Sequence, residues 1–90
     1  MVFEDITETF KALSDPTRQD ILMRLRRRRM TPGKLATYFD ISKPSLSHHL
    51  AILHRANLID SERVGQKIYY SFNATVFYEI MNKFINSLKK

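Results

Sequence analysis

Two short helical patterns, separated by a tight polar turn, lie between Thr31 and Leu58, and they constrain the fold more than any other stretch of the chain. The first pattern starts at Thr31, a helix-capping residue followed by Pro32. The second starts at Ser42, and its apolar residues recur at spacings that place them on one helical face: Leu46, Leu50 and Leu53. A short helix held across a tight turn by a preceding helix is the geometry of a helix-turn-helix. We therefore predict this motif at residues 31–56.

Length and composition limit the remaining possibilities. Ninety residues suffice for one modest core, so we expect a single domain over residues 1–90. The net charge of +6 favours an anionic partner, which could be nucleic acid or an anionic membrane surface. The absence of cysteine excludes disulfides, thiolate metal ligands and thiol redox switches. No apolar run approaches the roughly 20 residues that span a bilayer, and the start does not resemble a signal peptide. We expect a cytoplasmic protein without membrane insertion.

Both ends of the chain carry apolar residues at helical spacing. The last helix is expected to start after Asn73, a capping residue. Because these two apolar stripes are wider than so small a domain can cover, we predict that the first and last helices pack together and against their copies in a homodimer. No polar side chains converge on the stripe, so no cofactor is expected. The predicted dimer interface comprises Phe3, Ile6, Phe10, Phe77, Ile80, Met81, Phe84, Ile85 and Leu88.

The second predicted helix is expected to be capped by Ser14 and Asp15 and to end in the arginine run 26–29. Consecutive residues point in different directions around a helix, so at most one or two of these arginines can face DNA. The alternative is that the whole run is a solvated helix end whose cations complement the helix dipole. The sequence leaves open which arginines approach DNA.

Residues 58–72 are predicted to form a β-hairpin that turns at Gly65, because Ile68, Tyr69, Tyr70 and Phe72 give the second segment strand character. The tip is basic and polar, as required of a wing that contacts sugar and phosphate, although an ordinary hairpin tip has a similar composition. The predicted fold is mainly α with a β-hairpin wing. It is a winged helix-turn-helix with four helices, two strands and a final helix.

The three histidines are the first place to look for chemistry. His48 and His49 diverge by about 100° around a helix, and His49 and His54 miss the spacing of four that two imidazole ligands on one helix need. We therefore expect no metal site. His49 falls near the apolar face and should be a half-buried, hydrogen-bonded structural residue. No nucleophile, base and acid can be assembled, so neither catalytic residues nor enzyme activity is expected.

Three segments, FKALSDPTRQDILMRL, ISKPSLSHHLAILHRANLI and RVGQKIYYSF, resemble the ArsR/SmtB family of winged helix-turn-helix repressors across nearly the whole chain. Within that family the chain is most similar to the small, metal-independent autorepressors of the SdpR type. The resemblance implies transcriptional repression by a homodimer. Metal sensors of the family carry cysteines near the third helix, or Asp and His ligands on the last helix. The segment KLATYFD has no cysteine and the last helix has no histidine, so metal-triggered release is not expected.

The resemblance also implies roles for matching positions. Ser45, Ser47 and His48 would lie at the major groove. Thr31 and Lys43 would lie near phosphates, and Arg63 and Lys67 would lie in the wing. The predicted DNA-contacting residues are Thr31, Lys34, Ser42, Lys43, Pro44, Ser45, Ser47, His48, Arg55, Arg63, Gln66 and Lys67. The expected target is a double-stranded, pseudo-palindromic operator, with the chain's own promoter as one candidate.

Three alternatives remain open from the sequence: a sequence-neutral DNA binder, a winged-helix protein adapter, and a sensor with an unconventional ligand site. Release from an operator could depend on a protein partner, a small molecule or repressor concentration.

Overall fold

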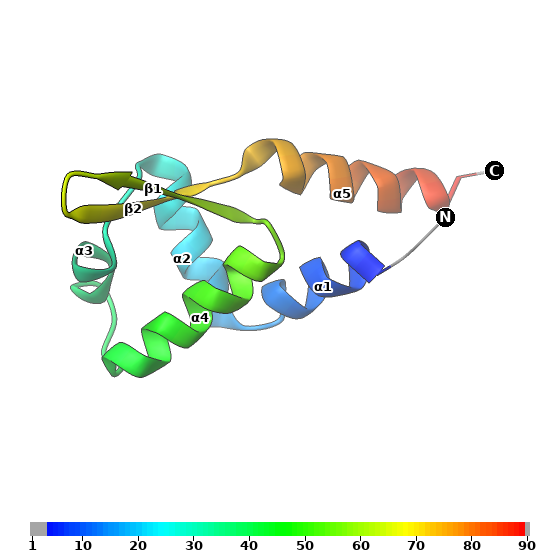
Figure 1. Cartoon of the computed structure of the whole chain (residues 1–90). Coiled ribbons are helices and arrows are strands. Elements are labelled where there is room, and N and C mark those ends of the chain that lie inside the picture. Colours follow the sequence, from blue (N-terminus) through cyan, green and yellow to red (C-terminus); the bar gives the residue numbers. More distant parts are fainter. Residues whose placement is uncertain (1–3, 90) are drawn as a thin grey trace.

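The computed structural model describes residues 4–89, so Phe3 of the predicted dimer interface lies outside the described residues. The described chain forms five helices and one two-stranded antiparallel sheet, in the predicted order. The elements are α1 (Glu4–Leu13), α2 (Pro16–Arg27), α3 (Pro32–Ala36), α4 (Lys43–Arg55), β1 (Ile59–Val64), β2 (Lys67–Phe72) and α5 (Ala74–Ser87). Figure 1 shows the hairpin and α3 at one end of an elongated molecule, with α1 and α5 running toward the other end.

The predicted capping residues fix the starts of three helices. The Thr31 side chain accepts a hydrogen bond from the backbone of Lys34 at 3.1 Å, and the Ser42 side chain accepts one from the backbone of Ser45 at 3.2 Å. Asn73 caps α5 in the same way. Each such cap contributes about 1 kcal/mol to helix stability. The boundaries of the helix-turn-helix are therefore encoded locally.

Asp15 caps α2, whereas Ser14 does not. The Asp15 carboxylate accepts hydrogen bonds from the backbone N–H groups of Thr17 and Arg18, at 2.8 and 3.1 Å. The bond from the Arg18 N–H, followed by the one from Thr17, lowers the pKa of Asp15, and partial burial opposes this shift. The Ser14 hydroxyl instead donates to the carbonyl of Lys11 at 2.6 Å and closes the end of α1. The prediction that both residues cap α2 is wrong for Ser14, because its hydroxyl lies closer to an orphan carbonyl of the preceding helix.

The core lies between α2, α3, α4 and the base of the hairpin. The inward face of α2 is buried there, together with the predicted inward face of α4. The largest fully buried apolar side chains of the described residues are Ile21, Leu35, Leu53, Leu58 and Ile59. Burial of each such side chain stabilises the fold by roughly 1.5–3 kcal/mol. This core fixes α3 and α4 to one another and to the first strand.

A tight turn at Asn57 connects α4 to the hairpin. Asn57 has a φ of 60°, its N–H donates to the carbonyl of His54, and the N–H of Leu58 donates to the carbonyl of Leu53. This pair of bonds is a Schellman motif, in which Asn is the usual substitute for glycine. The hairpin therefore leaves the end of α4 in a defined direction.

The hairpin turns through two residues. Val64 pairs with Lys67, which leaves Gly65 and Gln66 as the loop. Gly65 has a φ of 63°, and Gln66 lies outside the positive-φ region, as in a type II′ turn with glycine first. Gln66 thus belongs to the turn and not to the second strand.

The first and last helices pack together, as predicted. Phe10 of α1 meets Phe84 of α5 edge-on, with ring centroids 5.1 Å apart. Ile6 and Ile80 are already buried within the chain. Large apolar side chains stay exposed on the same two helices: Phe10 at 40%, Ile85 at 49% and Leu88 at 71%. Of the rest of the predicted interface, Phe77, Met81 and Phe84 are half-buried.

Candidate nucleic-acid interface

Helix α4, the candidate DNA-recognition helix, has one face in the core and one in solvent. Because Leu46, Leu50 and Leu53 point inward, helical geometry places Pro44, His48 and Arg55 on the opposite side, with Ser45 and Ser47 on its two flanks. These five polar-face residues are all exposed. Figure 1 shows α4 along one edge of the molecule, with its first turn at the same end as α3 and the hairpin. The helix can therefore present side chains without unfolding any other element.

The first turn of α4 is suited to an anion. Ser42, Lys43 and Ser45 are exposed there, and the N-terminal backbone N–H groups carry the positive end of the helix dipole. Lys34 of α3 is also exposed, with its Nζ 5.4 Å from the centre of the Tyr38 ring. Thr31 is half-buried, and its hydroxyl oxygen accepts the capping hydrogen bond, which leaves its O–H able to donate to a phosphate.

The tip of the hairpin carries the other predicted contacts. Arg63, Gln66 and Lys67 are all exposed. The Nε of Arg63 donates to the carbonyl of Gly65 at 3.3 Å, which holds this cation against the turn. The tip thus presents two cations and an amide, which suit contacts to phosphate and sugar.

The arginine run is only partly helical, and its last residue, Arg29, contacts the wing. Helix α2 ends at Arg27, and Arg28 is extended with a φ of −161°, so the expectation of a helical run is wrong for its second half. Arg29 pairs with Glu62 of β1 at 2.7 Å and lies over the ring of Tyr69, 4.6 Å from its centre. The wing therefore engages this guanidinium, and no local pattern indicates a pairing between residues 33 apart.

The segment before α3 is joined to the wing by a two-way backbone pairing. The N–H of Met30 donates to the carbonyl of Tyr70 at 3.0 Å, and the N–H of Tyr70 donates to the carbonyl of Met30 at 2.7 Å. Since Thr31 follows directly, the start of the helix-turn-helix and the wing are linked as one unit.

Arg55 lies apart from the other predicted contacts. It is the last residue of α4, roughly 18 Å along the helix axis from Lys43 at the usual rise per residue. There it lines a shallow hollow with Glu8 of α1 and Glu79 of α5. The structure brings together the start of α3, the start of α4 and the wing tip, and it does not bring Arg55 to them.

His49 is half-buried and hydrogen-bonded, as predicted. Its Nδ1 lies 3.2 Å from Nη1 of Arg18. Arg18 also donates from Nε to the carbonyl of Ala12 at 2.7 Å and from Nη2 to the carbonyl of Lys11 at 3.1 Å. Sequence reasoning missed Arg18, because a cation in the first turn of a helix carries no local sign of burial. It connects the end of α1 to the middle of α4.

The other two histidines have separate surroundings. His48 is exposed, and the ring of His54 meets Tyr70 of the wing edge-on, with centroids 6.5 Å apart. Among the described side chains, no group of three His, Asp or Glu residues is placed to hold a metal ion.

Comparison with known proteins identifies the family. The sequence model described as "Bacterial regulatory protein, arsR family" matches residues 15–61, from the cap of α2 to the first strand of the wing. The chain belongs to the ArsR family. It is 49% identical over 85 residues to the transcriptional repressor SdpR of Bacillus subtilis. This match covers 94% of each chain. It is 35% identical over 68 residues to a transcriptional repressor SmtB homolog of Synechocystis sp., covering 76% of this chain and 52% of that protein.

Solved structures of family members have the same fold. An ArsR-like transcriptional regulator from Rhodococcus sp. RHA1 superposes with a TM-score of 0.87 at 28% identity, covering 93% of this chain and 79% of that one. NolR from Sinorhizobium fredii superposes with a TM-score of 0.74 at 31% identity, covering 94% and 85%. The winged helix-turn-helix prediction is thereby confirmed.

Family membership makes the chain a DNA-binding transcriptional repressor of the ArsR/SmtB type and not an enzyme. Within residues 4–89, no helix is long and apolar enough to cross a membrane.

Proposed function

We propose that this ArsR-family repressor works in the cytoplasm as a homodimer on a pseudo-palindromic operator. The observation that carries the proposal is the shared placement of the α4 start, the α3 start and the basic wing tip at one end of the molecule. A helix with an exposed polar face beside a basic hairpin can enter a major groove while the hairpin lies along the flanking backbone.

Within this arrangement the side chains have different tasks. Ser45 and His48 read base edges from the exposed face of α4, and Ser47 adds a hydrogen-bonding group on its other flank. Cationic and polar side chains at the edges of the surface hold the phosphates and carry no sequence information. This second group comprises Thr31, Lys34, Ser42, Lys43, Arg63, Gln66 and Lys67. Arg55 reaches at most the backbone beyond the half-site.

The homodimer is supported by the apolar surface that α1 and α5 leave uncovered. Phe10 of α1, Ile85 of α5 and Leu88 just after α5 are large, apolar and exposed. Several such side chains on two helices that pack together favour association with a second copy. Two half-sites on successive major grooves lie about 34 Å apart, which is the separation that the proposal requires of the two α4 helices in the dimer. Ile6 and Ile80 support the surface from beneath.

A gel-shift series tests the function. The full chain is titrated against its own upstream DNA with excess nonspecific competitor, in zinc-loaded and in chelated buffer. Specific retention that is unchanged by zinc supports the proposal, including autoregulation. Retention lost equally to any DNA assigns a sequence-neutral binder, and no retention of any DNA assigns a protein adapter. Retention that depends on zinc assigns an unconventional metal sensor.

A further inference from the structure

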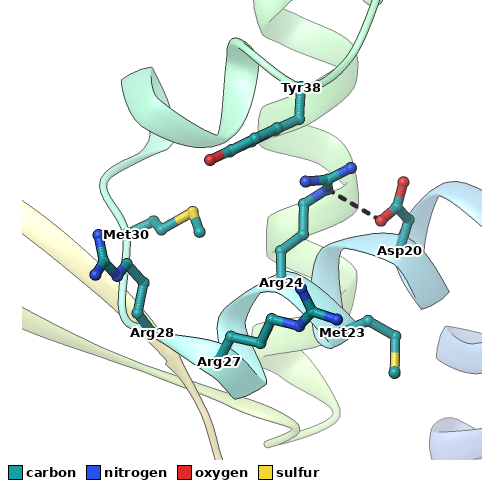
Figure 2. A pocket seen from close by; sticks show the side chains of 7 residues that line it. All are labelled: Asp20, Met23, Arg24, Arg27, Arg28, Met30 and Tyr38. Carbon is teal, nitrogen blue, oxygen red and sulfur yellow. Dashed lines mark hydrogen bonds and ion pairs between the residues drawn. The ribbon is translucent and has the colours of Figure 1, made fainter.

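A hollow of about 360 Å³ lies between α2 and the end of α3, outside the surface proposed for DNA. Figure 2 shows the guanidinium groups of Arg24, Arg27 and Arg28 around this hollow, with Tyr38 on its α3 side. Its volume is at the lower end of the range for small-molecule sites. The volume therefore suits a small molecule.

The charge of the hollow is only partly neutralised. The Nε of Arg24 bonds to Asp20 at 3.0 Å, and its guanidinium lies 4.0 Å from the centre of the Tyr38 ring. Arg27 and Arg28 are exposed, and no carboxylate within residues 6–89 forms an ion pair with either. Planar guanidinium groups bind carboxylate or phosphate through two parallel hydrogen bonds. The hollow therefore favours an anion.

The wall of the hollow is also partly apolar. Met23 and Met30 contribute thioether side chains to it, and Met30 is only 7% exposed. Methionine adapts its shape to irregular apolar ligands. An inorganic anion, or a phosphate on the outside of a DNA duplex, would leave this apolar surface uncovered. An anionic group attached to a compact apolar body would cover both parts.

The hollow is connected to both ends of α3. The backbone of Met30 pairs with Tyr70 of the wing, and the next residue, Thr31, caps α3. Tyr38 lies just beyond α3, where its N–H donates to the carbonyl of Leu35 at 3.0 Å. A molecule bound here touches α2 on one side and both ends of α3 on the other.

We propose that this hollow binds a small organic anion, namely a carboxylate or phosphate on a compact apolar body, and that its occupancy shifts α3 and the wing. Arg27 and Arg28 hold the anionic group, while Met30 and Tyr38 contact the body. The resulting change in DNA affinity rests on the proposed function, whereas the binding site does not.

Binding is tested with phenyl phosphate on the full chain, by calorimetry and by NMR of the Met30 methyl and Tyr38 ring signals. Inorganic phosphate and phenol serve as half-ligands. We expect one saturable site with a Kd of about 1 mM or tighter, and at least about tenfold weaker binding of each half-ligand. The double variant Arg27→Gln with Arg28→Gln should bind at least about tenfold more weakly. The control Arg26→Gln removes the same kind of charge from an exposed neighbour that does not line the hollow.

Any one of three results would contradict the proposed binding site. The first is that phenyl phosphate shows no saturable binding, and the second is that inorganic phosphate binds as tightly as phenyl phosphate does. The third is that Arg26→Gln weakens binding as much as the double variant does. Circular dichroism of the double variant verifies that it folds, since both substituted side chains are exposed. This arm needs no DNA, so a failure of the proposed function leaves its result intact.

The coupling is tested by measuring operator affinity with and without saturating phenyl phosphate. We expect a change of about fivefold or more, and by linkage the operator must change phenyl phosphate affinity by the same factor. Binding that leaves operator affinity unchanged contradicts the coupling. If the double variant loses affinity for every DNA sequence alike and phenyl phosphate does not bind, the arginines are DNA phosphate contacts and the proposal fails.

Discussion

Nη1 of Arg18 lies 3.2 Å from Nδ1 of His49, so this side chain of α2 contacts the middle of α4. The same guanidinium holds the carbonyls of Lys11 and Ala12 at the end of α1. In the dimer proposed above, α1 is part of the interface, so Arg18 would set the orientation of α4 relative to the partner subunit. Its half-buried position makes the three bonds stronger than they would be in open solvent.

Replacing Arg18 should reduce operator binding more than fold stability alone explains. Arg18→Lys keeps the charge, but a single ammonium cannot reach three acceptors in this planar arrangement. We expect the free energy of unfolding in urea to fall by about 1–3 kcal/mol. We expect operator affinity, measured where the variant is fully folded, to fall at least about tenfold, since this corresponds to only about 1.4 kcal/mol. Arg26→Lys is the control, and an Arg18→Lys protein with unchanged operator affinity would refute the orienting role.

Acid should weaken the fold through Asp15. Its pKa is lowered in the folded state, chiefly by the Arg18 N–H and then by the Thr17 N–H. The carboxylate therefore stabilises the fold fully above its unfolded pKa of about 3.9, and this contribution is lost as the pH falls through the lower folded value. Asp15→Asn keeps a capping oxygen but does not titrate. Urea unfolding between about pH 5 and 3 should show a steeper loss of stability for the wild type than for Asp15→Asn, and parallel curves would count against this cause.

The proposed dimer would depend on apolar side chains that the fold of the single chain does not need. Leu88→Glu places a charge at a position that is 71% exposed, so the protomer should fold normally. Because the substitution occurs twice across a two-fold interface, we expect the dimer dissociation constant to rise by at least about tenfold. Sedimentation velocity measures this change, with Met23→Glu as a control at an exposed apolar position on α2. Equal dimerisation of the two variants would exclude this end of α5 from the interface.

Wing cations should act through phosphate alone. Lys67→Ala removes an exposed charge at the hairpin tip without touching the core. Binding to every DNA sequence should weaken alike, and the slope of log K against log salt should fall by about 0.9 for each copy of the substitution. Lys11→Ala, at an exposed position on α1, is the matched control. A change in sequence preference, with the salt slope preserved, would show that Lys67 reads bases.

Sequence reasoning succeeded where the signal is local. Caps such as Thr31, Ser42 and Asn73 act within three residues, and the spacing of Leu46, Leu50 and Leu53 reports directly which side of α4 is buried. These features yielded the element order, the buried face of α4 and the half-buried state of His49.

The sequence was silent where pairing is distant. Arg18 and His49 are 31 residues apart, and Arg29 and Glu62 are 33 apart. No propensity or periodicity encodes such contacts, because they arise only when the core brings the elements together. The hollow beside Tyr38 could not be predicted from the sequence either, because a basic helix end gives no sign that its arginines surround a hollow.

The central claim is that Ser45 and His48 on α4 read the operator. The most direct measurement is a competition assay of the double variant Ser45→Ala with His48→Ala, using operator and scrambled DNA of equal length. Both side chains are exposed, so the fold should be retained. The account predicts that operator preference falls by about tenfold or more, since each base contact contributes about 1–3 kcal/mol, while binding to scrambled DNA changes little. An intact preference for the operator would contradict the account.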